Sequence, residues 1–202
     1  MSQLYGFTDK SQERMRSFKE GLLKSTPARN WNDALLPIAG EDSHWFCARE
    51  KYKNVNSSCF MSGDSRVNNN PFAILIYTVM MRNHNRIAKE LNVLHPDWTD
   101  EQLFQRAKSI NIEIYRRIIF NEWLPLILGD SMANEIKRNV NKVDTGNSNS
   151  EILYQVSNEY AVAASRFYLS MMPDRLTETN ADDRYFCTYF CYTFIYSTNI
   201  LH

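Results

Sequence analysis

Two long amphipathic stretches constrain the fold of this chain more than any other feature of its sequence. The first is predicted to begin at Pro71, a residue favoured in the first turn of a helix, and to end near Leu94. The second follows the break at His95-Pro96. Apolar residues recur at helical spacing in both: Ile74, Tyr77, Met81, Ile87 and Leu91, then Leu103, Ala107, Ile110, Ile114 and Ile118. Two such helices predict a mainly α domain.

Local signals place the ends of the second helix and suggest shorter elements elsewhere. Thr99 and Gln102 have the spacing of a capping box, and the helix is predicted to stop near Pro125 and Gly129. Ser157 is predicted to cap a third helix that extends to about residue 170. The remaining segments are expected to be a short capped helix at 8–20, an irregular stretch at 25–60, a polar loop at 141–150 and an aromatic-rich run from 185.

The composition agrees with a mainly α protein and excludes several functional classes. Gly and Pro are scarce, at six each in 202 residues, which disfavours a domain of short strands and tight turns. The 23 Lys and Arg residues balance the 23 Asp and Glu residues, so no nucleic-acid surface is expected. The most apolar segment, 186–200, is too short and too often interrupted by polar residues to span a membrane. No oligomeric state is indicated.

Four ordered sequence blocks carry a resemblance to a known family. They are C-F-x-x-G-D-S-R at 59–66, R-x-H-N-R-[IL]-A at 82–88, L-x-P-x-W at 94–98 and L-P-x-[IL]-L-G at 124–129. In this order they resemble the animal haem peroxidases, in particular the secreted type that includes peroxidasin and insect chorion peroxidase-like enzymes. The resemblance implies a partial helical domain of that type with irregular loops over residues 1–180. Residues 181–202 are left as an aromatic-rich tail of unknown role.

The resemblance assigns roles to two arginines. Arg66 matches the family's distal arginine, a catalytic residue whose guanidinium stabilises the negative charge that builds as the peroxide bond polarises. Arg166 matches a cofactor-binding arginine that pairs with a haem propionate. The alternatives are a surface arginine paired with Asp64 for Arg66, and for Arg166 a helix-surface pair with Glu159 or another acidic residue. Asn69 stands where the family often has a glutamate that esterifies a haem methyl group.

The chain departs from the family at the metal positions. The family block A-A-x-R-[FY]-G-H-S appears here as AASRFYLS, so Leu169 stands at the position of the histidine that binds haem iron. Tyr168 is the alternative iron ligand that we considered. Ser2 matches the last ligand of the family's calcium loop, whose other ligands would lie upstream of Met1. The distal histidine of the family is expected upstream as well.

The expected function follows from this balance of matches and departures. The family oxidises small donors with hydrogen peroxide at haem iron, in response to oxidative stress, and uses calcium. We expect this chain to be a family member without peroxidase turnover that does not itself bind haem; the alternative is a non-catalytic pseudoenzyme or binding fragment. The resemblance implies secretion, although no signal peptide follows Met1. It also implies a disulfide between Cys47 and Cys59.

One histidine invites a different interpretation. His84 lies within the R-x-H-N-R block, eleven residues before His95, a spacing that fits no metal motif. We interpret it as a hydrogen-bonded packing residue, and Met80 and Met81 beside it as residues of the core.

Overall fold

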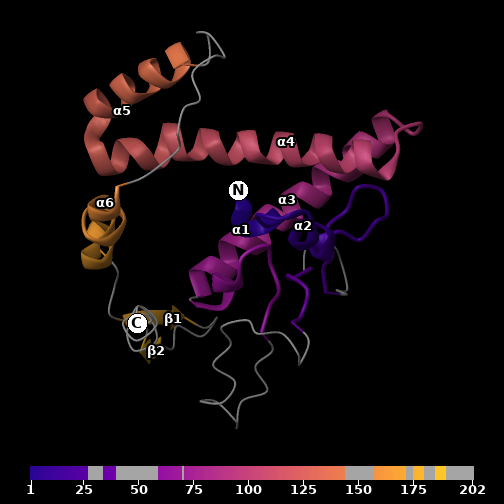
Figure 1. The fold of residues 1–202 in the computed structure, drawn as a ribbon. Coiled ribbons are helices and arrows are strands. Elements are labelled where there is room, and N and C mark those ends of the chain that lie inside the picture. The colour runs from indigo at the N-terminus through magenta and orange to yellow at the C-terminus, as the bar shows by residue number, and fades with distance from the viewer. Residues whose placement is uncertain are drawn as a thin grey trace. The chain divides into compact units, whose positions relative to one another are not determined.

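The structure, a computed structural model, describes residues 1–26, 34–39, 59–69, 71–143, 157–171, 175–179 and 185–189. They belong to two compact units, 1–137 and 138–202, each of which is described by itself. The elements, most of them drawn in Figure 1, are α1 (Ser2–Tyr5), α2 (Asp9–Met15), η3 (Ser65–Asn69), α3 (Pro71–Leu94), α4 (Asp100–Ile118), η4 (Ile119–Trp123), α5 (Leu124–Val143), α6 (Asn158–Val162), η5 (Ala164–Met171), β1 (Arg175–Thr179) and β2 (Tyr185–Tyr189). The fold is mainly helical, which confirms the predicted class.

The helices α3 and α4 form the centre of the first unit and pack against each other. The capping box is present at the start of α4, because Gln102 N–H donates to Thr99 Oγ1 and the Gln102 side chain accepts from Thr99 N–H. A break of five residues between Leu94 and Asp100 lets the chain reverse. The predicted bounds of α3 and the predicted start of α4 are therefore confirmed.

The apolar stripes of the two helices meet in two clusters. One is centred on Met81 and Phe104 and takes in Leu4 and Tyr5 of α1. The other joins Ile87, Ala88 and Ala107. Each residue of the two predicted stripes is either buried or packs against one of these clusters. Burial of apolar side chains on this scale is the main favourable term for the first unit.

The end of α4 differs in detail from the expectation. The helix continues through one turn of π-helix, η4, into α5. Pro125 is therefore tolerated near the start of a helix and does not end one. Gly129 does interrupt α5, with φ 77 and ψ 160, a conformation outside the helical region that glycine adopts at little cost. The predicted stop near this residue is thus present as a break within α5.

The shorter elements also depart from expectation in places. The helix predicted at 8–20 ends earlier, at Met15, and keeps the capping box on Thr8. Ser157 caps α6 by accepting a hydrogen bond from Tyr160 N–H, as predicted, but the helix then tightens into the 3-10 segment η5. The strands β1 and β2 form an antiparallel pair in which Leu176 lies opposite Thr188. This pair gives the start of the aromatic run an extended conformation. No helix in the described part of the chain is long and apolar enough to cross a membrane.

A close backbone approach joins α1 to the G-D-S-R turn. Gly63 N–H donates to Leu4 O at 3.1 Å, and a Cβ atom on Gly63 would lie 2.1 Å from Gly6 N and 2.6 Å from Ser2 O. Both neighbours are backbone atoms, which cannot rotate away as a flexible side chain could. Only glycine fits at this position.

We therefore expect Gly63→Ala to lower the free energy of unfolding by about 3 kcal/mol or more, as overpacking against rigid atoms does. Gly129→Ala is the matched control, because no atom lies within 4 Å of the place that its new Cβ would occupy and the cost is that of the backbone conformation alone, about 1–3 kcal/mol. Urea unfolding of both variants measures the difference. Equal losses in the two variants would contradict the steric argument.

Candidate functional site

Arg66 lies in η3, immediately before the start of α3. Its guanidinium donates hydrogen bonds to both oxygens of the Asp64 carboxylate. Nε lies 3.0 Å from Oδ1 and 3.1 Å from Oδ2, and Nη2 lies 2.5 Å from Oδ2. Arg66 N–H also donates to Asp64 Oδ1 at 2.9 Å. The Asp64 side chain is only 5% exposed, whereas that of Arg66 is 65% exposed. The hydrogen bonds from Arg66 lower the pKa of the Asp64 carboxyl group.

The turn that carries Arg66 is held against α1 by main-chain contacts. Asp64 N–H donates to Gln3 O at 3.1 Å, and Ser62 Oγ donates to the same carbonyl at 2.7 Å. On the other side of the turn, the Asn68 side chain pairs with both backbone groups of Phe60, at 2.9 and 2.8 Å. The position of Arg66 therefore depends on the position of α1.

A buried polar network fixes α1 in turn. The Tyr5 hydroxyl lies 2.9 Å from His84 Nδ1 and accepts a hydrogen bond from Asn111 Nδ2 at 2.9 Å. His84 Nε2 lies 3.0 Å from Gly21 O. Because a carbonyl can only accept, we place the His84 proton on Nε2, and the Tyr5 hydroxyl then donates to Nδ1. Every polar group of the tyrosine and histidine side chains is satisfied.

Burial sets the charge state of this network. It lowers the pKa of His84 to about 4 and raises that of Tyr5, so both side chains are neutral near pH 7. The interpretation of His84 as a packing residue is confirmed, and Met80 and Met81 are buried beside it. Sequence reasoning missed Tyr5 as the partner of His84, and Asn111 as the second partner of the Tyr5 hydroxyl. Asn111 could have been found as a polar residue beside the predicted apolar stripe of the second long helix.

The second unit holds the other family positions. Arg166 lies in η5 with an exposed side chain, and the described residues contain no ion pair between it and Glu159. Leu169 lies in the same segment, but its side chain is outside the part that the structure describes. The family resemblance predicts that Arg66 and Arg166 both face the space where haem would lie. Arg66 belongs to the first unit and Arg166 to the second, so this stays a prediction.

A model of the animal haem peroxidase family matches residues 1–200. The chain belongs to the animal haem peroxidase family. Peroxidasin and a peroxidase, both of Drosophila melanogaster, are each 33% identical to it and match 88% and 87% of this chain. The matched parts are 12% and 25% of those relatives, so the chain spans a quarter of their length or less. The family match includes residues 181–200, and the division into a partial domain at 1–180 and a tail of unknown role at 181–202 stays a prediction.

Solved structures support the same fold. Peroxidase A from Dictyostelium discoideum superimposes with a TM-score of 0.70 at 24% identity, over 95% of this chain and 35% of that chain. A fatty acid alpha-dioxygenase of Arabidopsis thaliana superimposes with a TM-score of 0.62 at 21% identity, over 90% of this chain and 28% of that chain. At these identities the likeness shows the fold and not the reaction.

The residues present do not fit the metals that the family implies. Leucine has no lone pair with which to bind iron, and the family resemblance assigns position 169 to the iron ligand, an assignment that stays a prediction. Calcium takes six to eight oxygen ligands, and among residues 1–202 the resemblance assigns only Ser2 to this role, which stays a prediction. Among the described residues, no group of three or more His, Cys, Asp or Glu side chains could hold a metal ion.

The disulfide expectation can be tested directly. Cys59 is disulfide-bonded, and Cys47 lies outside the described residues. We expect Cys47 to be its partner, and a loop of this size to contribute about 3 kcal/mol by the chain-entropy estimate. Non-reducing peptide mapping by mass spectrometry identifies the pair. A peptide that links Cys59 to Cys187 or Cys191 would contradict the prediction.

The buried histidine gives a pH prediction. The unfolded state binds a proton on His84 near pH 6.5, and the folded state does so only near pH 4. The free energy of unfolding should therefore fall as the pH is lowered through this window. Urea unfolding at a series of pH values measures the slope. His84→Gln should flatten it, whereas His95→Gln, a change in a partly exposed ring, should leave it in place. An unchanged slope in His84→Gln would contradict this account.

Proposed function

We propose that this chain is a member of the animal haem peroxidase family that keeps the arginine-bearing turn of the domain but does not turn over peroxide. The observation that carries the proposal is the leucine at position 169, where the family binds iron through a histidine. Haem peroxidases hold their iron through a protein ligand, and leucine cannot supply one. Haem-dependent oxidation of a small donor therefore lacks its first requirement in this chain.

The arginine-bearing turn supports descent from a catalytic domain. Arg66 follows Asp64 in a turn whose hydrogen bonds to α1 and to Asn68 fix its backbone. A guanidinium held in this way presents a positive charge at any working pH, which suits stabilisation of a developing anion. In this chain the same charge is committed to the buried Asp64 carboxylate.

The described histidines do not supply an acid–base group beside Arg66. Both ring nitrogens of His84 are occupied by Tyr5 and Gly21, and burial keeps the ring neutral. The His95 ring stacks on Trp98 at 4.0 Å between centroids. General acid–base catalysis contributes about 10²–10⁴ in rate, and in this proposal neither His84 nor His95 supplies it.

We also place the chain outside the cell. The disulfide at Cys59 supports this, because disulfides persist in oxidising compartments such as the extracellular space. Hydrogen peroxide and small donors are the substrates of the family. In this proposal they are not substrates of this chain.

The test is oxidation of guaiacol by hydrogen peroxide in the presence of haemin. The purified chain should give a rate no higher than that of free haemin. Leu169→His should shift the Soret band towards imidazole ligation and leave turnover unchanged, because it adds an iron ligand and no acid–base group. Val162→His, on an exposed position of α6, is the control for a histidine added elsewhere.

Two results would overturn the proposal. One is turnover by the unmodified chain well above that of free haemin, in which case Tyr168→Phe would test the neighbouring phenol as iron ligand. The other is turnover restored by Leu169→His but not by Val162→His, which would show that the rest of the catalytic machinery is intact.

A further inference from the structure

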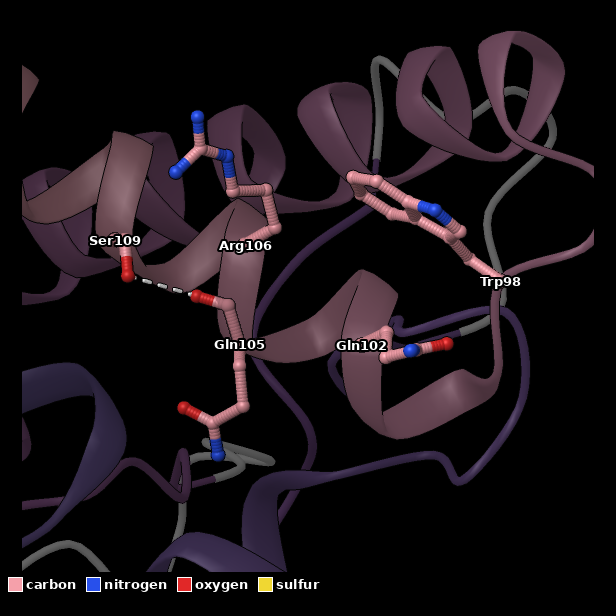
Figure 2. A pocket seen from close by; sticks show the side chains of 5 residues that line it. All are labelled: Trp98, Gln102, Gln105, Arg106 and Ser109. Atoms are coloured by element: carbon pink, nitrogen blue, oxygen red, sulfur yellow. Dashed lines mark hydrogen bonds between the residues drawn. The ribbon is translucent and has the colours of Figure 1, made fainter.

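An open pocket of about 440 Å³ lies along the first turns of α4, away from Arg66 and its turn. The residues that line it, drawn in Figure 2, are Trp98, Gln102, Gln105, Arg106 and Ser109. Their spacing puts them on one side of the helix, because residues three and four apart are neighbours on a helical surface. Leu103 and Ala107 lie between them in sequence and face the core.

The indole of Trp98 is held rigidly before any ligand arrives. Its ring stacks on that of His95, with 4.0 Å between centroids and 5° between planes. Trp98 N–H of the main chain donates to His95 O at 3.1 Å, which fixes the turn that carries both rings. A flat ring covered on one side by a partner is preorganised to stack a second flat ring on the other.

Most polar groups around the pocket are already committed. The Gln102 carbonyl oxygen accepts from Thr99, the Gln105 amide donates to Glu101, and the Ser109 hydroxyl donates to Gln105 O. What remains is a set of donors. In the described part of the chain, no hydrogen-bond or ion-pair partner is present for the Arg106 guanidinium, the Trp98 indole N–H or the Gln102 amide N–H groups.

Arg106 is the one charged residue among the described residues that line the pocket, and two carboxylates at the start of α4 are engaged by another arginine. Asp100 and Glu101 both bind the buried Arg16 guanidinium, Asp100 with 2.6 Å between the charged atoms. Figure 2 shows Arg106 and Trp98 extending from the same side of the helical segment. Uncommitted donors beside a stacked ring favour an anion with a flat apolar body.

We propose that this pocket binds a small aromatic carboxylate. Its ring stacks on the Trp98 indole, and its carboxylate accepts two hydrogen bonds from the Arg106 guanidinium in the bidentate geometry that arginine favours. The Gln102 amide donates to a remaining carboxylate lone pair. Nothing in this site depends on haem, on Leu169 or on the fate of peroxide.

Benzoate is the probe, and the indole N–H signal of Trp98, followed by NMR in the full chain, is the readout. A dissociation constant on the order of 1 mM is expected for a ligand of this size. Acetate, which lacks the ring, and benzyl alcohol, which lacks the charge, should each bind about tenfold more weakly. Added salt should weaken benzoate binding, since the ion pair is exposed.

Variants separate the pocket from the rest of the surface. Arg106→Gln should weaken benzoate binding about ten- to hundredfold. Arg106→Lys should weaken it less, because lysine keeps the positive charge, although it lacks the two parallel N–H donors of arginine. Arg117→Gln, an exposed arginine on the same helix, and Trp123→Phe are the matched controls and should change nothing. Arg106 is exposed, so its variants should fold, and circular dichroism checks this.

Three results would overturn the proposal. The first is an unmoved Trp98 signal at benzoate concentrations far above about 1 mM. The second is acetate or benzyl alcohol binding as tightly as benzoate, which would remove the combined requirement for ring and charge. The third is equal weakening by Arg106→Gln and Arg117→Gln, which would reduce the effect to a general response of the surface to charge.

Discussion

The hydrogen bonds of the Tyr5 hydroxyl are the interaction on which the first unit depends. The hydroxyl joins α1 to His84 on α3 and to Asn111 on α4, and His84 extends the chain of bonds to Gly21. Each of these groups is buried, so each would cost free energy if its partner were lost. Apolar packing alone would hold α3 and α4 together, but it is not directional. The polar network selects one position of α1 against that pair of helices.

The position of the arginine-bearing turn depends on the position of α1. Its backbone bonds to Gln3 and Leu4, so the same short helix that Tyr5 anchors is the surface on which the turn is built. Gly63 makes the approach possible because a side chain there would meet backbone atoms. The blocks S-Q-L-Y-G, G-D-S-R and H-N-R are far apart in sequence and form one assembly. None of the contacts in this assembly requires an iron ligand at position 169, so the assembly can persist when that ligand is absent.

The sequence predicted the parts of this assembly that rest on local patterns. Helical periodicity and capping signals placed α3 and the start of α4, and the motif order placed Arg66 just before α3. It did not predict that the Tyr5 hydroxyl would meet His84 and Asn111, because a long-range pairing leaves no periodic signal in either segment. Gly129 was identified as a breaker, yet the π turn before α5 was not, since its energetic difference from a regular turn is small. The pocket beside Trp98 was missed because its residues look like an ordinary solvated helix face.

The ion pair between Arg66 and Asp64 gives a structural reason, separate from catalysis, for an arginine at position 66. The Asp64 carboxylate is almost fully buried and receives its charged hydrogen bonds from Arg66. Removing the arginine would leave this carboxylate without its counter-charge and lower the stability, by less than for a fully buried pair because the Arg66 side chain is 65% exposed. Under the function that we propose, stability is a sufficient reason to retain Arg66 after the reaction with peroxide has been lost. A change from histidine to leucine at position 169 does not carry this cost. Replacing a metal-binding histidine by an apolar residue removes a function but leaves no buried charge without a partner. The two positions can thus diverge, and under the proposed function Leu169 is the one that reports on the reaction.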